Sequence, residues 1–319
     1  MCVMRIGAET GRALPHKGES PRPSSDGNSL LVDVIVVTYN SRSRVFPCAK
    51  AALSAGANVI VVDSASPDRS LEALGDLPVT TIQLSENRGF GFGCNRGWES
   101  GSAPYVLFLN PDAVLDEAAL GALAAVLDRE PAVGAVGPRL LEEDGTLEWS
   151  QRRYPRLRST FARALYVHHL APQAQWVDEM IRVPAVYEEP GEPDWLSGAC
   201  LLVRRELLER IGGFDEGFFL YSEDTDLCKR IRDAGYTLRY EPSAVVHHVG
   251  GASAPRSGLL HVLASSRVRY MRKHRGVLAG ALERTGLVLE SLLRLVVSRG
   301  GADQRRGHLR TLAALLRGA

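Results

Sequence analysis

The apolar run LLVDVIVVTYN, at residues 30–40, constrains the fold more than any other segment of the chain. A β-branched run of this length that ends in polar residues is typical of a strand buried on both faces, as in a parallel sheet. Strand-like runs and helical patterns then follow one another along the chain. The helical patterns lie at residues 44–55 and 116–130, and the strand-like runs lie at residues 58–66, 79–87, 104–115 and 132–141. The alternation predicts an α/β fold with a Rossmann-like, mostly parallel central sheet flanked by helices.

Polar residues follow the ends of the predicted strands. They are Thr38, Tyr39, Asn40, Asp63, Asn87, Asn110, Pro111 and Asp112. In open parallel sheets, ligands bind outside the carboxyl ends of the strands, where residues from several strands meet. We therefore expect a ligand site along this edge of the sheet.

The second half of the chain is less regular. Residues 148–192 mix Arg, Pro, Tyr and Trp without a clear period, and we interpret them as a variable excursion that shapes part of a binding site. Residues 194–219 predict a strand and then a helix. The next helix is predicted to begin at Ser222, its expected N-cap, and to stop at Gly235. A closing strand is predicted over residues 237–253.

Charge is spread unevenly along the chain. Residues 254–319 contain 13 Lys and Arg against 3 Asp and Glu, so this segment carries +10 and the first 253 residues carry −9, for a total of +1. We expect a disordered leader over residues 1–30, an α/β domain over residues 31–253 and a basic helical C-terminal extension over residues 254–319. The extension indicates an anionic surface or partner. Nucleic acid is the least favoured partner, since no recognition motif accompanies the charge.

No segment indicates export or membrane insertion. The five cysteines form no CxxC pair, so neither a zinc site nor a disulfide scaffold is indicated, and their odd number fits a reducing compartment. The first 29 residues lack the apolar core of a secretory signal, and no apolar run approaches the roughly 20 residues of a spanning helix. We expect a cytoplasmic protein, with peripheral contact at the inner face of the plasma membrane left open.

Three motifs contain candidate functional residues, and each also has a purely structural interpretation. Asp112, at the end of a buried strand, could hold a hard divalent cation, although Asn-Pro-Asp also forms ordinary turns. The segment ENRGFGFGCNRG (86–97) would let the backbone approach a ligand, with Arg88 and Arg96 meeting phosphate, or it is a flexible loop before a helix. Of His247 and His248, one could bind a cation while the other points away.

The acidic cluster at residues 223–226 has two interpretations. Glu223, Asp224 and Asp226 follow the apolar run FFLY and stand where a helix is predicted to begin. They could be an acidic first turn, which favours the positive end of the helix dipole, or one carboxylate could act as a base. From these residues alone, the capped helix is the simpler interpretation.

The motifs occur in a specific order. VDVIVVTYNS, VIVVDSAS, ENRGFGFGCNRG and YVLFLNPDAVL come first, and DWLSGACLLVRRELLERIGGFDEGFFLYSEDTDLCKRIRDAGY and HHVGGAS follow. This series resembles the family 2 glycosyltransferases with the GT-A fold, and within them the bacterial rhamnosyltransferase-like branch. The resemblance covers residues 32–253, with a looser echo in SSRVRYMRKHRG (265–276).

The resemblance implies an inverting transfer of a sugar from a nucleotide diphosphate donor, such as dTDP-rhamnose or a UDP-sugar, with Mg²⁺ or Mn²⁺. It implies that the nucleobase and ribose meet Thr38, Tyr39, Asn40 and Asp63, and that the nucleotide and diphosphate run along Asn87, Arg88, Gly89 and Asn95. Asn110-Pro111-Asp112 stands in place of the family's Asp-x-Asp motif, so only Asp112 is a charged ligand there. His248 fits the family's HxxGxS pattern with Gly251 and Ser253 and is the expected second metal ligand, with His247 as the fallback.

The same resemblance assigns roles on the acceptor side. Asp224 is the expected base that takes the proton of the acceptor hydroxyl, Glu223 orients acceptor hydroxyls, and Asp226 supports only the first turn of its helix. Trp195 and Gly198 are expected at the acceptor, with Gly198 and Ala199 keeping the backbone close to the donor sugar. The implied acceptor is a hydroxyl of a glycan, of a polyprenyl-diphosphate-linked sugar or of a metabolite.

The sequence leaves two other functions as alternatives, and it allows two roles for the C-terminal extension. A nucleotidyltransferase would carry a glycine-rich loop after the first strand, which VVTYNSRSR lacks. A non-catalytic sugar-nucleotide-binding protein would not need Asp112, Asp224 and His248. The extension either packs against the core or lies on a membrane, with GLVLESLLRLVV inserting its apolar face.

Overall fold

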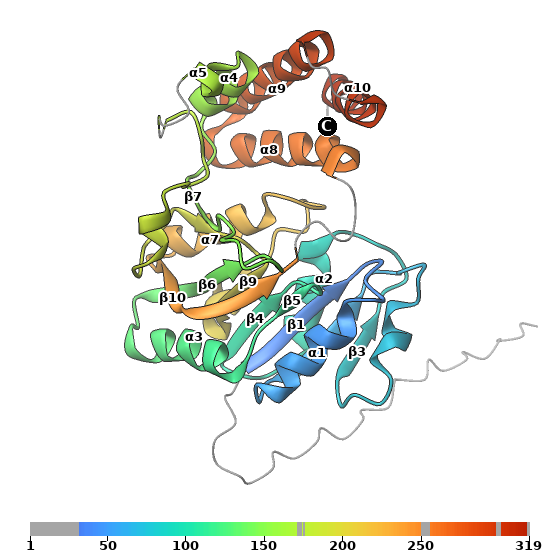
Figure 1. The fold of residues 1–319 in the computed structure, drawn as a ribbon, viewed down its shortest axis with the longest axis vertical. Helices are drawn as coiled ribbons and strands as arrows, with labels where there is room; N and C mark the ends of the chain where they lie inside the picture. The colour runs from blue at the N-terminus through green and yellow to red at the C-terminus, as the bar shows by residue number, and fades with distance from the viewer. Residues whose placement is uncertain (1–31, 171–173, 175, 250–255, 298–300, 318–319) are drawn as a thin grey trace, which may run out of the picture.

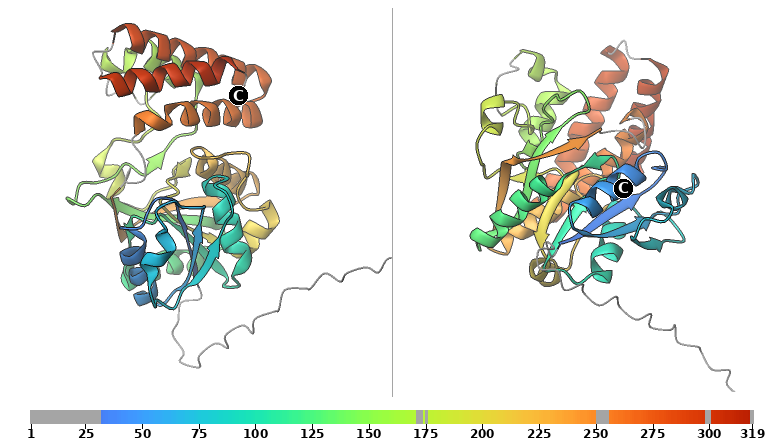
Figure 2. Two further views of the ribbon diagram at one scale, coloured as in Figure 1. Left: turned by 90° about the vertical axis from the view of Figure 1, so that its right-hand side faces the viewer. Right: turned by 60° about the horizontal axis from the view of Figure 1, so that its bottom comes forward.

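The computed structural model describes residues 32–170, 174, 176–249, 256–297 and 301–317. The expected leader, Gly251 and Ser253 lie outside these residues. An α/β body is stacked against a separate layer of helices (Figure 1), and two further views show the same division (Figure 2). Within the described residues, none of the helices combines the length and apolarity needed to cross a bilayer.

The body is built on one eight-stranded sheet with the order β3-β2-β1-β4-β9-β6-β10-β5. The strands are β1 (Val32–Thr38), β2 (Asn58–Asp63), β3 (Thr80–Gln83), β4 (Tyr105–Leu109), β5 (Ala113–Val114), β6 (Val133–Leu141), β9 (Cys200–Arg204) and β10 (Thr237–His248). The first four neighbours run parallel, as do β6 and β10. Strand β9 is antiparallel to both of its neighbours, and β5 is antiparallel to β10. The predicted α/β fold with a mostly parallel central sheet is confirmed.

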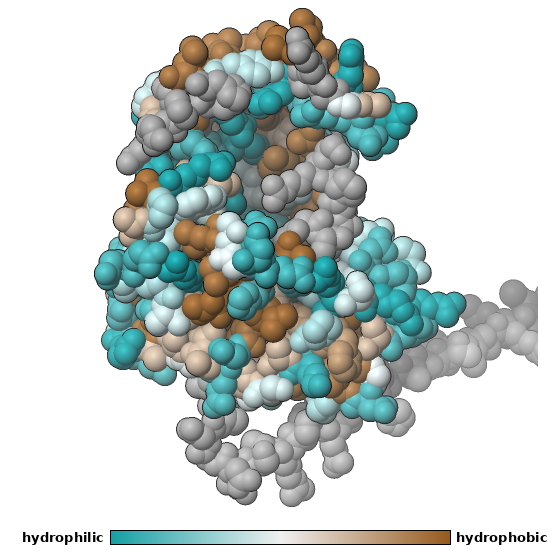
Figure 3. Space-filling view, in the orientation of Figure 1, coloured by the Kyte–Doolittle hydropathy of each residue, from teal (hydrophilic) through white to brown (hydrophobic). Residues whose placement is uncertain are grey.

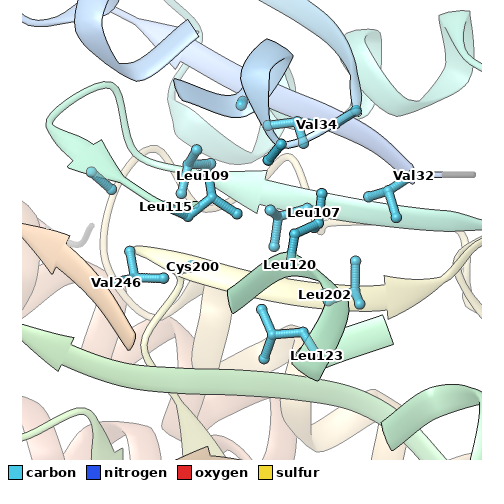
Figure 4. Packing of buried hydrophobic residues seen from close by; sticks show 14 of the residues in the cluster. Val32, Val34, Leu107, Leu109, Leu115, Leu120, Leu123, Cys200, Leu202 and Val246 are labelled. Carbon is cyan, nitrogen blue, oxygen red and sulfur yellow. The ribbon is translucent and has the colours of Figure 1, made fainter. Parts of the chain in front are cut away.

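The alternating side chains of β1 supply two separate cores. Val32, Val34 and Val36 face one core, whereas Ile35 and Val37 face the other. Figure 4 shows the first core, in which leucines of β4 and of α3 pack against the valines of β1. The helices of the body are α1 (Val45–Ser54), α2 (Phe90–Ser100), α3 (Glu117–Arg129), α6 (Arg205–Ile211) and α7 (Glu223–Asp233), with 3-10 turns η1 (Ser70–Leu74) and η2 (Pro184–Tyr187).

The glycine-rich segment is a packed helix, not the flexible loop that we considered. A Cβ on Gly97 would lie 2.3 Å from Ile35 Cγ2, and one on Gly93 would lie 2.7 Å from Val37 Cγ1. Since real Cβ atoms do not come so close, these glycines let α2 lie directly on β1. The pattern that suggested a backbone near a ligand therefore serves helix–sheet packing at these two positions.

The helical layer combines two parts of the sequence. Its members are η3 (Arg256–Leu259), α8 (Leu260–Arg275), α9 (Val277–Val297) and α10 (Ala302–Leu316), together with α4 (Leu157–Ala164) and α5 (Val167–Leu170) from the middle segment. The predicted extension is thus helical, and α4 packs against α9. Arg267 of α8 is 8% exposed and bonds Glu283 of α9 at 2.8 Å and Glu179 at 2.6 Å. This buried ionic cluster connects the middle segment (residues 148–192) to the helical layer.

Candidate active site

A pocket of about 630 Å³ opens between the body and the helical layer. Its body side is formed by Asn110, by Glu223 and Asp224 at the start of α7, and by Trp195 and Gly198. Trp195 belongs to β8 (Trp195–Leu196), which pairs with β7 (Gln151–Arg152). The opposite side is formed by the middle segment, η3 and α8. The structure therefore brings the predicted base and the predicted acceptor residues to one cavity.

Asp224 is held in one orientation by the backbone around it. Gly198 N donates to its Oδ2 at 3.1 Å, and Thr225 N donates to its Oδ1 at 2.7 Å. A Cβ on Gly198 would lie 3.2 Å from Asp224 Cβ, so the absence of a side chain lets the two segments meet closely. Burial raises the pKa of the Asp224 carboxyl above its usual value, while these backbone bonds and Arg152 act to lower it. A half-buried, oriented carboxylate of this kind is suited to accept a proton.

Glu223 occupies a different environment from its neighbour. It is 5% exposed, and its Oε2 has no hydrogen-bond partner. Burial first, and then the charge of Asp224, raise its pKa well above the usual value. Because Asp224 has hydrogen-bond donors and Oε2 of Glu223 has none, the anionic form is better stabilised at Asp224 than at Glu223.

The turn into α7 differs from the predicted cap. Ser222 occupies the N-cap position, but its side chain makes no capping bond; its carbonyl accepts from Asp226 N at 2.8 Å instead. Tyr221 and Ser222 both have positive φ, at 67° and 65°. Backbone in this region costs of order 1–3 kcal/mol per residue and is common next to functional sites. The turn fixes where Glu223 and Asp224 enter the pocket.

Asp226 links α7 to the helical layer. It is fully buried and pairs with Arg230 of α7 and with Lys273 and His274 of α8, each at 2.7 Å. Burial acts to raise its pKa, but these partners outweigh it and lower the pKa to about 2. The expectation that Asp226 supports only the first turn of its helix was wrong, because the carboxylate joins two parts of the molecule.

Asp112 and His248 meet beside Asn110, one of the residues that line the pocket. His248 Nε2 lies 3.3 Å from Asp112 Oδ1 and 3.1 Å from the amide of Asn110, while its Nδ1 lies 2.7 Å from Glu148 Oε2. Burial acts to lower the pKa of His248, but Asp112 and Glu148 outweigh it and raise the pKa to about 9. His247, the next residue along β10, is exposed. Of the two histidines, His248 is thus the one beside Asp112.

This pair suits a divalent cation. One carboxylate oxygen and one imidazole nitrogen are donors that Mn²⁺ and Mg²⁺ accept, and two neighbouring ligands about 2.1 Å from an ion lie about 3 Å apart. The carboxylate of Glu148 on Nδ1 would orient the ring, as is usual for metal-binding histidines. In the described part of the chain, no group of three His, Cys, Asp or Glu side chains converges to hold a metal. Two protein donors would leave the other coordination positions to a ligand.

The predicted nucleobase residues lie at adjoining strand ends. Thr38 Oγ1 donates to Asp63 Oδ1 at 3.0 Å, and Ser66 N donates to Asp63 Oδ2 at 3.0 Å. Tyr39 and Asn40 follow β1 and are exposed. The parallel pairing of β1 with β2 places Thr38 opposite Asp63, as expected for strand ends that share one edge.

The residues expected along the diphosphate make several structural contacts. Asn87 Oδ1 accepts from Gly89 N at 2.9 Å, and a Cβ on Gly89 would lie 2.1 Å from the carbonyl oxygen of Phe219. Arg88 is exposed, and Arg96 pairs with Glu216 at 3.0 Å.

One of these expectations, for Asn95, is corrected. Its side chain is buried, donates to Phe214 O and Glu216, and accepts from Phe214 N and Trp98 Nε1. All four hydrogen-bonding positions of the amide are used, so its side chain has none left for a nucleotide.

Four residues at the site were missed by sequence reasoning. They are Glu148, Arg152, Lys273 and His274. The first two lie in the irregular middle segment, where no period marks an inward face. The last two lie in the weakly matching segment at residues 265–276, whose echo of the family was the one available signal.

Residues 33–212, more than half of the chain, match the family model described as glycosyl transferase family 2. This chain belongs to glycosyl transferase family 2. It is similar to the N-acetylglucosaminyl-diphospho-decaprenol L-rhamnosyltransferase of Mycobacterium tuberculosis, with 31% identity over 76% of this chain and 83% of the relative. It is also similar to the rhamnosyltransferase WbbL of Escherichia coli, with 26% identity over 54% of this chain and 62% of the relative.

These relatives place the glycosyltransferase in the rhamnosyltransferase-like branch, as the motif order predicted. Among solved structures, a mannosyltransferase from Pyrobaculum calidifontis in complex with GDP-Man and Mn²⁺ has the same fold, with a TM-score of 0.52 and 19% identity over 89% of this chain and 84% of that one. The GT-A fold and the assignment as a transferase are confirmed, and the two alternative functions are not favoured.

Proposed function

We propose that this glycosyltransferase transfers rhamnose from dTDP-rhamnose to a hydroxyl of a lipid-diphosphate-linked sugar, with inversion at the anomeric carbon. The observation that carries the proposal is the oriented carboxylate of Asp224 beside Glu223 in the pocket. Its donor and acceptor classes are supported by the relative from M. tuberculosis, which covers most of both chains.

The residues around Asp224 supply the proton chemistry. The Asp224 carboxylate accepts the acceptor hydroxyl proton as that oxygen attacks the anomeric carbon. Glu223 forms a hydrogen bond with the acceptor sugar, and Trp195 offers an aromatic face to its ring. Gly198 holds Asp224 in place through its N–H, and Gly198 and Ala199 bring the backbone close to the donor sugar.

The donor lies along the carboxyl ends of the strands. Thr38, Tyr39, Asn40 and Asp63 line the nucleobase and ribose, and Asn87, Arg88, Gly89 and Asn110 lie along the nucleotide diphosphate. Asp112 and His248 hold Mg²⁺ or Mn²⁺, which when bound neutralises the charge that develops on the leaving diphosphate.

The donor and metal assignments are tested by binding measurements. Titration calorimetry with dTDP-rhamnose, a UDP-sugar and GDP-mannose, with and without Mn²⁺, is expected to favour dTDP-rhamnose. His248→Ala should raise the Kd measured with Mn²⁺ at least about tenfold, since a metal donor is lost, and should change the Mn²⁺-free Kd little. His247→Ala is the matched control and should behave as wild type. Tighter binding of the UDP-sugar would refute the rhamnosyl donor, and equal loss in both variants would refute the metal assignment.

We further propose that residues 31–253 form the catalytic domain and that the helical layer rests on the inner face of the plasma membrane. Leu278, Leu282, Leu292 and Val296 are 74%, 40%, 48% and 83% exposed, and their spacing places them on one face of α9. Figure 3 shows apolar surface along the outer edge of this layer. The net charge of +10 over residues 254–319 complements an anionic bilayer.

Sedimentation with vesicles tests the membrane contact. The protein is expected to sediment with phosphatidylglycerol vesicles but not with phosphatidylcholine vesicles. A Leu278→Asp, Val296→Asp double variant should bind the anionic vesicles at least about tenfold more weakly, because two charges replace inserted apolar groups. If the wild-type protein stays in the supernatant with phosphatidylglycerol, this surface does not bind the membrane.

A further inference from the structure

Arg152 is a cation within the pocket that the proposed mechanism does not use. Its guanidinium lies 5.3 Å from the centroid of the Trp195 ring, and its Nε is buried without a hydrogen-bond partner. It is close enough to Asp224 to lower the pKa of that carboxyl. Arg152 therefore lies next to both the aromatic face and the base.

The other arginines that line the pocket already form ion pairs with carboxylates. Arg163 lies 3.5 Å from Glu290, Arg182 lies 2.8 Å from Asp178, and Arg267 is enclosed by Glu179 and Glu283. Among the described residues, no carboxylate pairs with Arg152. A half-buried cation that forms no salt bridge binds an anion well, because part of its desolvation cost is already met in the folded protein.

Part of the pocket wall nearest the helical layer is apolar, although Arg163 and Arg267 also lie on that side. Leu259 of η3 and Leu260 and Leu263 of α8 line it and are half-buried, and Leu220 lies at the edge of the body. A sugar hydroxyl at Asp224, an anion at Arg152 and an apolar chain along these leucines would fill the pocket with one molecule. That sequence of groups is the order found in a lipid-phosphate glycoside.

We propose that Arg152, stacked on Trp195, binds a phosphate of the lipid-linked acceptor, whose chain runs along Leu259, Leu260 and Leu263. The inference rests on the proposed function for its choice of acceptor. It adds the residue that distinguishes a phosphorylated acceptor from a free glycan. The donor diphosphate is a less suitable ligand for Arg152, because it is assigned to Asp112 and His248, neither of which lines the pocket.

The proposal is tested first by binding, with no transfer required. Farnesyl diphosphate and farnesol serve as probes in titration calorimetry with the full-length protein. Arg152→Met is expected to raise the Kd for farnesyl diphosphate about tenfold to a hundredfold, the range for a lost hydrogen bond to a charged group, and to leave farnesol unchanged. Arg182→Met, which removes a cation already paired with Asp178, is the matched control and should change either Kd less than about twofold.

Kinetics then separate binding of phosphate from tuning of the base. With dTDP-rhamnose as donor, Arg152→Met should raise KM for farnesyl-diphospho-GlcNAc about tenfold, without changing KM for octyl-GlcNAc or for the donor. Equal losses with both acceptors, together with a shifted pH profile, would mean that Arg152 acts only on Asp224 and would overturn the proposal. A higher donor KM, or an unchanged Kd for farnesyl diphosphate, would also overturn it. Lack of transfer by the wild-type enzyme would instead refute the proposed function.

Discussion

Asp224→Asn is expected to lower the rate of sugar transfer by about 10²- to 10⁴-fold, the contribution of a positioned general base. The amide has nearly the same shape as the carboxylate and can still accept from Thr225 N, but it cannot take the acceptor proton. The fold should remain intact, because Asn has nearly the volume of Asp and leaves no cavity. The measurement is initial-rate transfer at saturating donor and acceptor, with circular dichroism to confirm folding.

Asp233→Asn is the matched control for this variant. Asp233 lies at the other end of α7, is exposed and forms a salt bridge with Lys229. It should retain activity within about twofold of wild type. Transfer by Asp224→Asn within tenfold of wild type would rule out Asp224 as the base.

The pH dependence of the transfer rate provides a second test of Asp224 as the base. Burial raises the pKa of Asp224 above its usual value, and the base must be anionic, so activity should fall as the pH falls through that raised pKa. In Asp224→Asn, the residual activity should lose this acidic limb.

Asp226→Asn is expected to lower the free energy of unfolding at pH 7 by about 2 to 4 kcal/mol. The substitution leaves Arg230, Lys273 and His274 around a neutral amide. Because the folded-state pKa of Asp226 is about 2, below the usual 3.8, its contribution is fully present above about pH 4 and is lost as the pH falls towards 2. Urea unfolding monitored by fluorescence at pH 7 and at lower pH measures both effects.

A double-mutant cycle tests whether this loss reflects the link between α7 and α8. His274→Gln should destabilise the wild-type protein but have a smaller effect in the Asp226→Asn background, since the two side chains are in contact. Asp233→Asn again serves as the control, with a change of less than about 1 kcal/mol. Additive effects of Asp226→Asn and His274→Gln would show that Asp226 does not couple α7 to the helical layer.

The sheet could be predicted because its strands are buried on both faces. The runs at β1 and β2 are rich in β-branched residues and the run at β4 is apolar, so their positions and their shared carboxyl edge followed from the pattern. The packed α2 could not be predicted in the same way. Its glycines have poor helix propensity, and their reason, close contact with Ile35 and Val37, exists only in the folded protein.

The site was predicted to different extents at its different parts. The positions of Asp224 and His248 followed from motif order, and the structure brings Asp224 to the pocket and His248 to Asp112. Asn95 matched the motif equally well, but its burial between α2 and the segment at residues 213–216 was not visible in the sequence. The roles of Arg152 and Asp226 depend on contacts with residues that are distant in the sequence. Such contacts depend on tertiary packing, which local pattern does not encode.

The central claim is that Asp224 drives an inverting transfer of rhamnose. The most direct test is to incubate the full-length protein with dTDP-rhamnose, Mn²⁺ and farnesyl-diphospho-GlcNAc and to determine the anomeric configuration of the product by NMR. The account predicts a rhamnosylated product whose anomeric configuration is opposite to that of the donor and whose formation is lost in Asp224→Asn. A product that retains the donor's configuration would contradict the account, because attack assisted by a single base on the acceptor side must invert that centre.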